Sequence, residues 1–367
     1  MNVNKLKLLF ALQDDPMAPA ATLARKVGIT PPTARAWLED LQRKRVYGGV
    51  HANLRARRIG LELDDFILRV DSYDSLLKVE QFCEEHPYTS YRARVFGGEK
   101  QGIMLQFRQP EEAKTHLLTA FDEMERQGLV REVREIPTLA AEYGSKYTRP
   151  KFSAWDEERM AWRFDWKKWW NRRLRQANSD QTDTTSFKPL SLDMMDAKLL
   201  EQITRNARRK NTEIIEAMGY RKDEPGIQQK VSSRLKVLER KVVEEYRVFI
   251  EWFHFDVYNT PFIMARADEE VTDNLIRRLS QGGFPFGSSI RKTRNGFVWS
   301  ARLPAAHVSE LIALVWSIAK SYEVLMIDYK HSVVYGLWSE AFDEDTRWWK
   351  TSKSFCCDEP LKAIGLA

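Results

Sequence analysis

The feature that most constrains this chain of 367 residues is an internal repeat. Each half begins with three predicted helices and continues with alternating strands and helices in the order βαββαβ. A shorter match follows each half, because AWDEERMAW at Ala154–Trp162 corresponds to AFDEDTRWW at Ala341–Trp349. This match lies outside generic helix patterning, so it indicates two similar halves joined in one chain.

The stretch Ala20–Arg45 predicts two short helices joined by a tight turn. Gly28 permits a sharp exit from the first helix, Thr30 can cap the second helix, and Pro31 suits its first position. Such a pair is typical of a helix-turn-helix, whose second helix lies in the major groove of DNA. A helical hairpin inside a core is the alternative. The second helix has an apolar stripe formed by Ala34, Leu38 and Leu41.

A looser copy of this unit is predicted after residue 190. Its helices are expected at Leu192–Ile203, Thr212–Met218 and Ile227–Lys241, and the turn before the last helix is longer. The segment Gly226–Lys241 has a net charge of +4, against +2 for Pro31–Arg45. We therefore expect the two halves to contribute unequally to binding.

Two further patterns adjoin the helical units. Val46–Gly60 predicts a wing of two short strands, because the pair Gly48-Gly49 permits a turn, and Val242–Phe255 predicts the second wing. The bridge Ser153–Asn178 predicts a tryptophan-rich helix with a basic end. The polar stretch Asn178–Lys188 predicts a flexible linker.

The predicted fold class is α+β, with two winged helix-turn-helix units, each followed by a ferredoxin-like βαββαβ domain. The expected domains are a winged helix-turn-helix at 1–60, a ferredoxin-like domain at 61–145, a Trp-rich basic segment and linker at 146–190, a second winged unit at 191–257, a second ferredoxin-like domain at 258–337, and a Trp-containing tail at 338–367.

Positive charge is concentrated in a few segments, although the whole chain has a net charge of only +6. Ala20–Gly60 holds nine Lys/Arg against two acids, and Arg205–Ile250 holds twelve against seven. Basic segments in an otherwise acidic chain suit a polyanionic partner, and a solvated Lys/Arg-rich face is the alternative. We expect double-stranded DNA as the partner.

Other functional classes have little support in the sequence. Three cysteines form no CxxC pair, and six histidines show no metal-binding spacing, so we expect no metal and no cofactor. No apolar run is long enough for a membrane span or a signal peptide, so we expect a cytoplasmic protein with no membrane partner. We also expect no enzymatic activity.

The segments LARKVGITPPTARAWLEDLQRKRVYGGV and LDMMDAKLLEQI, each followed by βαββαβ, resemble the Lrp/AsnC family of transcription regulators. The resemblance covers most of the chain in two copies. It implies an intrachain pseudo-dimer, and a homo-oligomer stays open. The family's effector turn is glycine-x-x-aspartate, but neither GGEKQG (Gly97–Gly102) nor TRNG (Thr293–Gly296) keeps the aspartate, so a small-molecule effector also stays open.

Two alternatives to a regulator remain. Related pairs of these domains occur in siroheme decarboxylases, which carry a histidine/tyrosine/arginine segment. The segment KYTRPKFSAW (Lys146–Trp155) resembles it but lacks the histidine. The other alternative is a protein-interaction module that has lost DNA binding. Glu39 and Asp40 in the first reading helix support this alternative, because they would repel phosphates that they face.

The regulator hypothesis assigns residues to two roles. The residues predicted to read base edges are Thr33, Arg35, Gln228, Gln229, Lys230, Ser233 and Arg234. The residues predicted to contact phosphates are Arg43, Lys44, Arg45, Arg57, Arg58, Arg208, Arg209, Lys210 and Arg240.

Overall fold

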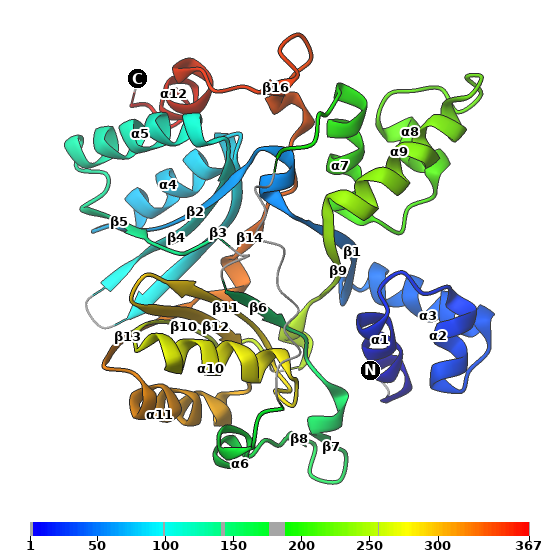
Figure 1. The fold of residues 1–367 in the computed structure, drawn as a ribbon, viewed down its shortest axis with the longest axis vertical. Coiled ribbons are helices and arrows are strands. Elements are labelled where there is room, and N and C mark those ends of the chain that lie inside the picture. Colours follow the sequence, from blue (N-terminus) through cyan, green and yellow to red (C-terminus); the bar gives the residue numbers. More distant parts are fainter. Residues whose placement is uncertain (1–2, 98–99, 141–143, 176–187, 256, 367) are drawn as a thin grey trace.

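The computed structural model describes residues 3–97, 100–140, 144–175, 188–255 and 257–366 (Figure 1). It combines helices and sheets, and its first unit holds α1 (Val3–Asp14), α2 (Ala20–Val27) and α3 (Pro31–Arg43). The turn between α2 and α3 forms as expected. Gly28 takes a left-handed φ of 75°, and the Thr30 hydroxyl accepts a hydrogen bond from the Thr33 N–H at 3.3 Å. Glycine adopts this φ at little cost, which explains the sharp turn.

A second three-helix unit lies in the other half of the chain. It contains α7 (Met194–Asn206), α8 (Asn211–Ala217) and α9 (Ile227–Lys241). Val231, Leu235 and Leu238 of α9 are buried, so the predicted apolar stripe faces the interior of this unit. Most of the predicted linker between the two halves lies outside the described residues.

The two predicted wing hairpins are wrong. Residues 46–60 form one strand, β1 (Tyr47–Leu54), followed by a short 3₁₀ helix, and β1 pairs antiparallel with β9 (Val243–Ile250) of the other half. The glycines serve this pairing: a Cβ at Gly48 would lie 2.5 Å from the Phe249 ring on β9. The result is a two-stranded ribbon between the helical units, which we call the β1–β9 ribbon (Figure 1).

Both predicted βαββαβ units are present. The first consists of β2 (Glu62–Arg69), α4 (Tyr73–Glu85), β3 (Thr89–Gly97), β4 (Lys100–Gln109), α5 (Lys114–Arg126) and β5 (Glu132–Ile136). The second consists of β10 (Thr260–Arg266), α10 (Glu269–Ser280), β11 (Gly287–Thr293), β12 (Gly296–Arg302), α11 (Val308–Ile318) and β13 (Ser321–Ile327).

The two sheets share a core, and their helices cover the outer faces (Figure 1). Their strands join into one ten-stranded sheet in the order β5-β2-β4-β3-β13-β10-β12-β11-β6, with β14 also paired to β3. We call the part with β2 to β5 the first sheet and the part with β10 to β13 the second sheet. Apolar side chains from both sheets meet in one buried cluster, including Ile67, Val95 and Met104 of the first sheet and Phe262 and Leu325 of the second. Alternate residues of each strand therefore face either this inter-sheet layer or the outer helices.

Short segments cross between the halves in both directions. β6 (Ser145–Thr148) follows the first unit but pairs with β11 of the second, whereas β14 (Val333–Val334) follows the second unit and pairs with β3 of the first. The C-terminal α12 (Glu359–Ala363) likewise packs against α4 of the first unit. Each unit is completed by segments from the other half.

The predicted helix over Ser153–Asn178 is wrong for most of its length. A hairpin of β7 (Trp155–Asp156) and β8 (Ala161–Trp162) comes first, and only α6 (Trp166–Asn171) is helical. The matching stretch near the C-terminus forms the equivalent hairpin of β15 (Phe342–Asp343) and β16 (Trp348–Trp349). The acids in these repeats close the turns: Asp156 Oδ1 accepts a hydrogen bond from the Arg159 N–H at 3.1 Å.

Candidate functional sites: helix faces and an inter-sheet arginine cluster

The solvent face of α3 is polar. Arg35 is exposed, and the half-buried Thr33 hydroxyl contacts the Thr30 hydroxyl at 2.8 Å. Asp40 accepts hydrogen bonds from Lys5, Arg43 and Lys44. The charge of the Asp40 carboxylate is therefore balanced within the first helical unit. Arg43 and Lys44 each use one of their hydrogen-bond donors for this contact. Arg45 is exposed just beyond the helix.

The solvent face of α9 carries more of the predicted contacts. Gln229, Lys230 and Ser233 are exposed, while Gln228 donates to the Lys222 carbonyl at 3.3 Å. Arg234 differs, because its Nε donates to Asp196 of α7 at 2.7 Å and Asp196 is fully buried. That ion pair holds α9 against α7, and Arg234 must leave it before it can reach a base.

Other predicted phosphate contacts have structural partners. The Arg208 guanidinium donates to two backbone carbonyls of the first helical unit, those of Pro16 and Ala18, both at 2.8 Å. Arg209 donates to Gln202 at 2.7 Å, and Arg57 pairs with Glu62 at 2.7 Å. Arg208 therefore fastens the two helical units together. Arg58 is half-buried, whereas Lys210 and Arg240 are exposed.

A second group of charged residues lies between the two sheets. Ile103, Leu105 and Phe107 of β4 pack toward the outer helices, so the alternate residue Arg108 faces the inter-sheet layer. Arg302 of β12 lies on the inter-sheet side by the same alternation, because Val298 of that strand belongs to the shared core. We call the following six residues the inter-sheet arginine cluster: Arg108, Arg247, Arg302, Tyr91, Tyr147 and Tyr329.

The side chains of this cluster contact one another. The Arg247 guanidinium lies 4.0 Å from the centroid of the Tyr147 ring, and that of Arg302 lies 5.9 Å from the Tyr329 ring. All six residues are half-buried, so the cluster is largely enclosed and only part of it meets solvent. Two carboxylates border the cluster. Glu245 is shared by Arg247 at 2.7 Å and Arg149 at 2.8 Å, and Glu251 interacts with Tyr329.

Arg108 and Arg302 have no carboxylate within ion-pair distance among the described residues. Burial, and then the like charge of Arg247, lower the pKa of Arg108 to about 10. Burial alone would lower the pKa of Arg302, but the surrounding tyrosines Tyr147, Tyr329 and Tyr91 raise it. Burial also raises the pKa of Tyr91 to about 12, so this phenol keeps its proton at neutral pH. Perturbed groups of this kind are typical of functional sites.

Sequence reasoning missed this cluster, although a signal was present. Gly102 pairs with Arg69 and Gly296 pairs with Arg266 at the corresponding ends of β4 and β12. Counted from these glycines, both strands read G-x5-R-x-P, as GIMLQFRQP and GFVWSARLP. Arg108 and Arg302 therefore occupy equivalent positions in the two βαββαβ units.

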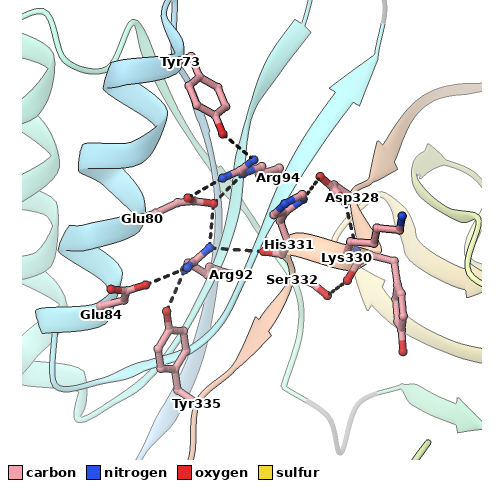
Figure 2. A network of polar contacts seen from close by, with 11 residues as sticks. Tyr73, Glu80, Glu84, Arg92, Arg94, Asp328, Lys330, His331, Ser332 and Tyr335 are labelled. Carbon is pink, nitrogen blue, oxygen red and sulfur yellow. Dashed lines mark hydrogen bonds and ion pairs between the residues drawn. The ribbon is translucent and has the colours of Figure 1, made fainter. Parts of the chain in front are cut away.

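The outer face of β3 holds a contrasting pair of arginines that are fully paired (Figure 2). Arg94 Nη2 and Arg92 Nη1 donate to the buried Glu80 at 2.9 and 2.8 Å. Arg92 also donates to the Tyr335 hydroxyl at 2.8 Å and to the His331 carbonyl at 3.4 Å. This network attaches the end of the second half to β3, and its charges are balanced within the protein.

A small hollow at the opposite end of the inter-sheet layer is also charge-balanced. Its lining includes Arg69, Glu132, Arg134 and Glu323. Arg69 pairs with Glu132 at 3.1 Å, and Arg134 pairs with Glu323 at 2.6 Å. Its volume of about 20 Å³ suits a water molecule. In the part of the chain that the structure describes, no group of three potential metal ligands occurs and no helix could cross a membrane.

Comparisons with known proteins identify one domain and one full-length fold. Residues 1–46 match the model of a winged helix-turn-helix DNA-binding family. A comparison with curated protein sequences gives no match. The N-terminal helices are therefore a DNA-binding type of domain, whereas the match does not extend to the second helical unit.

Solved structures extend the likeness over the whole chain. The structure of the siroheme decarboxylase NirDL bound to an iron-uroporphyrin III analogue has a TM-score of 0.54 at 13% identity, covering 96% of each chain. The match to a second NirDL structure covers 99% of this chain and 98% of the NirDL chain, with the same TM-score and identity. An AsnC family regulator from Agrobacterium tumefaciens is 20% identical, covers 37% of this chain and 88% of its own, and has a TM-score of 0.29.

The NirDL match corrects one expectation. The sequence alone led to the expectation that this chain has no enzymatic activity. A fold shared with an enzyme over nearly the full length of both chains overturns that exclusion. The charged groups that this chain places between its sheets are arginines and tyrosines on strands far apart in the sequence, so no metal or cysteine motif includes them.

Proposed function

We propose that this chain is a sequence-specific DNA-binding transcription regulator of the Lrp/AsnC type, with two reading heads paired within one chain. The observation that carries the proposal is that α3 and α9 each bury an apolar stripe and turn a polar face to solvent. The winged helix-turn-helix match supports the first head. The second head rests on the buried stripe and exposed face of α9.

We assign the larger share of DNA contact to α9. Gln229 and Ser233 have exposed side chains that can bond base edges, and Lys230 can contact a phosphate or a guanine. Arg35 is the corresponding exposed cation of α3. Arg208 and Arg234 act instead in holding the helical units, because their guanidinium groups are bonded to protein acceptors.

The spacing of the heads is a further part of the proposal. The β1–β9 ribbon and the Arg208 contacts to Pro16 and Ala18 connect the two helical units within one chain. Two linked heads bind half-sites that lie at a fixed separation. In simple helix-turn-helix pairs this separation is one turn of the DNA helix, about 10 base pairs. Because α3 and α9 differ in sequence, we expect the two half-sites to differ.

Selection of bound duplexes from a random pool, followed by gel shifts over a range of salt concentrations, tests this function. The full chain is expected to enrich one sequence with two unlike half-sites. Gln229→Ala should relax preference at one position and cost about 1–3 kcal/mol in binding. Lys230→Ala should weaken binding and reduce the salt slope by about one unit if Lys230 contacts a phosphate.

The matched control is Lys362→Ala, which removes an exposed lysine on α12, outside both helical units. Its operator affinity and salt slope should equal those of the unaltered chain. A pool that yields no enriched sequence, or equal effects of Lys230→Ala and Lys362→Ala, would contradict the proposal.

The full-length similarity to NirDL favours a second candidate, decarboxylation of a tetrapyrrole carboxylate. Such a reaction breaks the carbon–carbon bond to the carboxylate, releases carbon dioxide and places a proton on the remaining carbon. Arg108 and Arg302 could hold carboxylates between the sheets, and Tyr91 keeps a proton that it could donate.

Incubation of the purified chain with siroheme tests this candidate. The expected result is release of carbon dioxide together with a lighter tetrapyrrole in the mass spectrum, and loss of both with Arg302→Gln. Unchanged siroheme after prolonged incubation would remove the candidate and would leave the DNA-binding proposal untouched.

A further inference from the structure

Arg108 and Arg302 stand apart from the other enclosed arginines of this protein. Arg92 and Arg94 share the carboxylate of Glu80, and Arg291 pairs with the buried Asp65. Arg108 and Arg302 face tyrosines and a third arginine instead. The protein thus balances its enclosed cations elsewhere but leaves these two without a carboxylate among the described residues.

Leaving a guanidinium enclosed without a counter-charge is costly. Removing a charged group from water costs several kcal/mol unless a partner of opposite charge replaces the lost hydration. The depressed pKa of Arg108 is one sign of this cost. An anion placed between the arginines would supply the missing counter-charge through forked, charge-assisted hydrogen bonds.

The positions of the two arginines argue against coincidence. Both follow the same G-x5-R-x-P pattern on the third strand of their βαββαβ units, and both face the layer where the sheets meet. Arg108 lies near Arg247, Arg247 lies against Tyr147, and Tyr147 lies near Arg302. The two guanidinium groups thus belong to one connected cluster and can hold acid groups of one ligand. Arg247, on β9, adds a third cation beside them.

The tyrosines restrict the shape of such a ligand. The rings of Tyr147 and Tyr329 already lie against arginines, and Tyr91 packs against the apolar inter-sheet core. Aromatic walls favour a flat, unsaturated body, while the arginines favour carboxylates at its edges.

We propose that the inter-sheet arginine cluster is a binding site for a small, flat molecule carrying two or more carboxylates, with Arg108 and Arg302 each holding one of them. This site goes beyond DNA binding and lies on the βαββαβ units rather than on the helix faces. If the ligand is a tetrapyrrole, this site is the substrate site of the second candidate function, and the proposal then rests on that function. For any other flat polycarboxylate it is independent of that function.

Calorimetric titration of the full chain, without DNA, tests the site. The probes are benzene hexacarboxylate and iron-uroporphyrin as flat polycarboxylates, citrate as a non-planar one, and inorganic phosphate, all at equal ionic strength. At least one flat probe is expected to bind at one site per chain, more tightly than citrate or phosphate. Arg108→Gln and Arg302→Gln should each weaken that binding by about tenfold or more, and Arg108→Lys should restore part of it.

The matched control is Arg266→Gln, which removes an exposed arginine from β10 of the same sheet. Its affinity for the flat probe should be unchanged. Thermal unfolding without ligand provides a second readout. Arg108→Gln should melt no lower than the unaltered chain, because it removes an uncompensated charge, and it should lose the stabilisation that the ligand gives.

Three results would overturn the proposal. They are binding of phosphate and citrate as tightly as the flat probes, equal loss of binding in Arg266→Gln and Arg108→Gln, and a clearly lower melting temperature of ligand-free Arg108→Gln, which would indicate a structural role. Gel shifts with the same variants keep the outcomes separate: loss of ligand binding with normal DNA binding concerns this site alone, and the reverse concerns the reading heads alone.

Discussion

The Lys5 ammonium lies 2.6 Å from Asp40 Oδ2, so α1 supplies a counter-charge to the acid in the middle of α3. Arg43 and Lys44 contact the same carboxylate at 2.8 and 3.1 Å. Helix α3 therefore does not present Asp40 to solvent as an unbalanced negative charge. This contact weakens the argument that α3 has lost its DNA-binding role.

Asp40→Asn should destabilise the chain near neutral pH and destabilise it less at strongly acidic pH. The hydrogen bond from Lys5, followed by those from Arg43 and Lys44, holds the pKa of Asp40 well below its ordinary value. A lowered pKa stabilises the folded state above the ordinary pKa near 4, and this contribution is lost as the pH falls through the folded value. Urea unfolding at pH 7 and about pH 2 measures it. A difference between the variant and the unaltered chain that is as large at pH 2 as at pH 7 would contradict the prediction.

Glu80→Gln should be among the more destabilising single changes in the first βαββαβ unit. It leaves Arg92 and Arg94 enclosed with one carboxylate fewer, which costs about 3 kcal/mol or more in comparable buried pairs. Glu84→Gln is the control, because Glu84 pairs with Arg92 but is half exposed, and exposed pairs contribute about 1 kcal/mol or less. Equal shifts of the urea midpoint would show that Glu80 has no special role.

Gly60→Ala should cost more stability than Gly28→Ala. Both glycines have a left-handed φ, 76° and 75°, so each alanine pays a backbone cost of about 1 kcal/mol. A Cβ at Gly60 would also lie 2.3 Å from the Trp348 ring, whereas nothing lies within 4 Å of one at Gly28. Thermal unfolding of both variants makes the comparison, and a larger loss in Gly28→Ala would refute the contact between Gly60 and the β15–β16 hairpin.

Arg208→Gln and Arg240→Gln should separate structural from DNA-contacting arginines. Arg208 donates to the Pro16 and Ala18 carbonyls, so its loss should lower the melting temperature by releasing two charge-assisted hydrogen bonds. Arg240 is exposed, so its loss should leave the melting temperature unchanged and flatten the salt dependence of DNA binding. The reverse pattern would mean that Arg208 faces DNA.

Local sequence signals predicted the elements well, because caps and periodicity act within a few residues. Thr30 and Gly28 mark the turn before α3, and both βαββαβ units appear in the predicted order. The wings failed because their partner strand is distant: β1 pairs with β9, nearly 200 residues away, and no local pattern specifies such a partner. The predicted helix after Ser153 failed because its tryptophans pack into a hairpin.

The candidate site was less predictable than the fold. Charge and helix pattern indicated Arg35 and Lys230, which are exposed, but could not show that Arg208 and Arg234 are bonded to protein acceptors. The inter-sheet arginine cluster depends on which face of a strand meets the other sheet. That depends on sheet packing, although the repeated G-x5-R-x-P pattern already marked both arginines.

The crossing of β6 and β14 has a consequence for synthesis of the chain. The β3 edge is covered by Val333–Val334, and α4 is covered by α12, and both segments are made more than 200 residues after β3 and α4. The first βαββαβ unit can form its own sheet early, but one edge and one helix face stay uncovered until β14 and α12 have been made. Newly made chains are thus exposed to pairing with one another during that interval, and slow elongation through the second half would lengthen it.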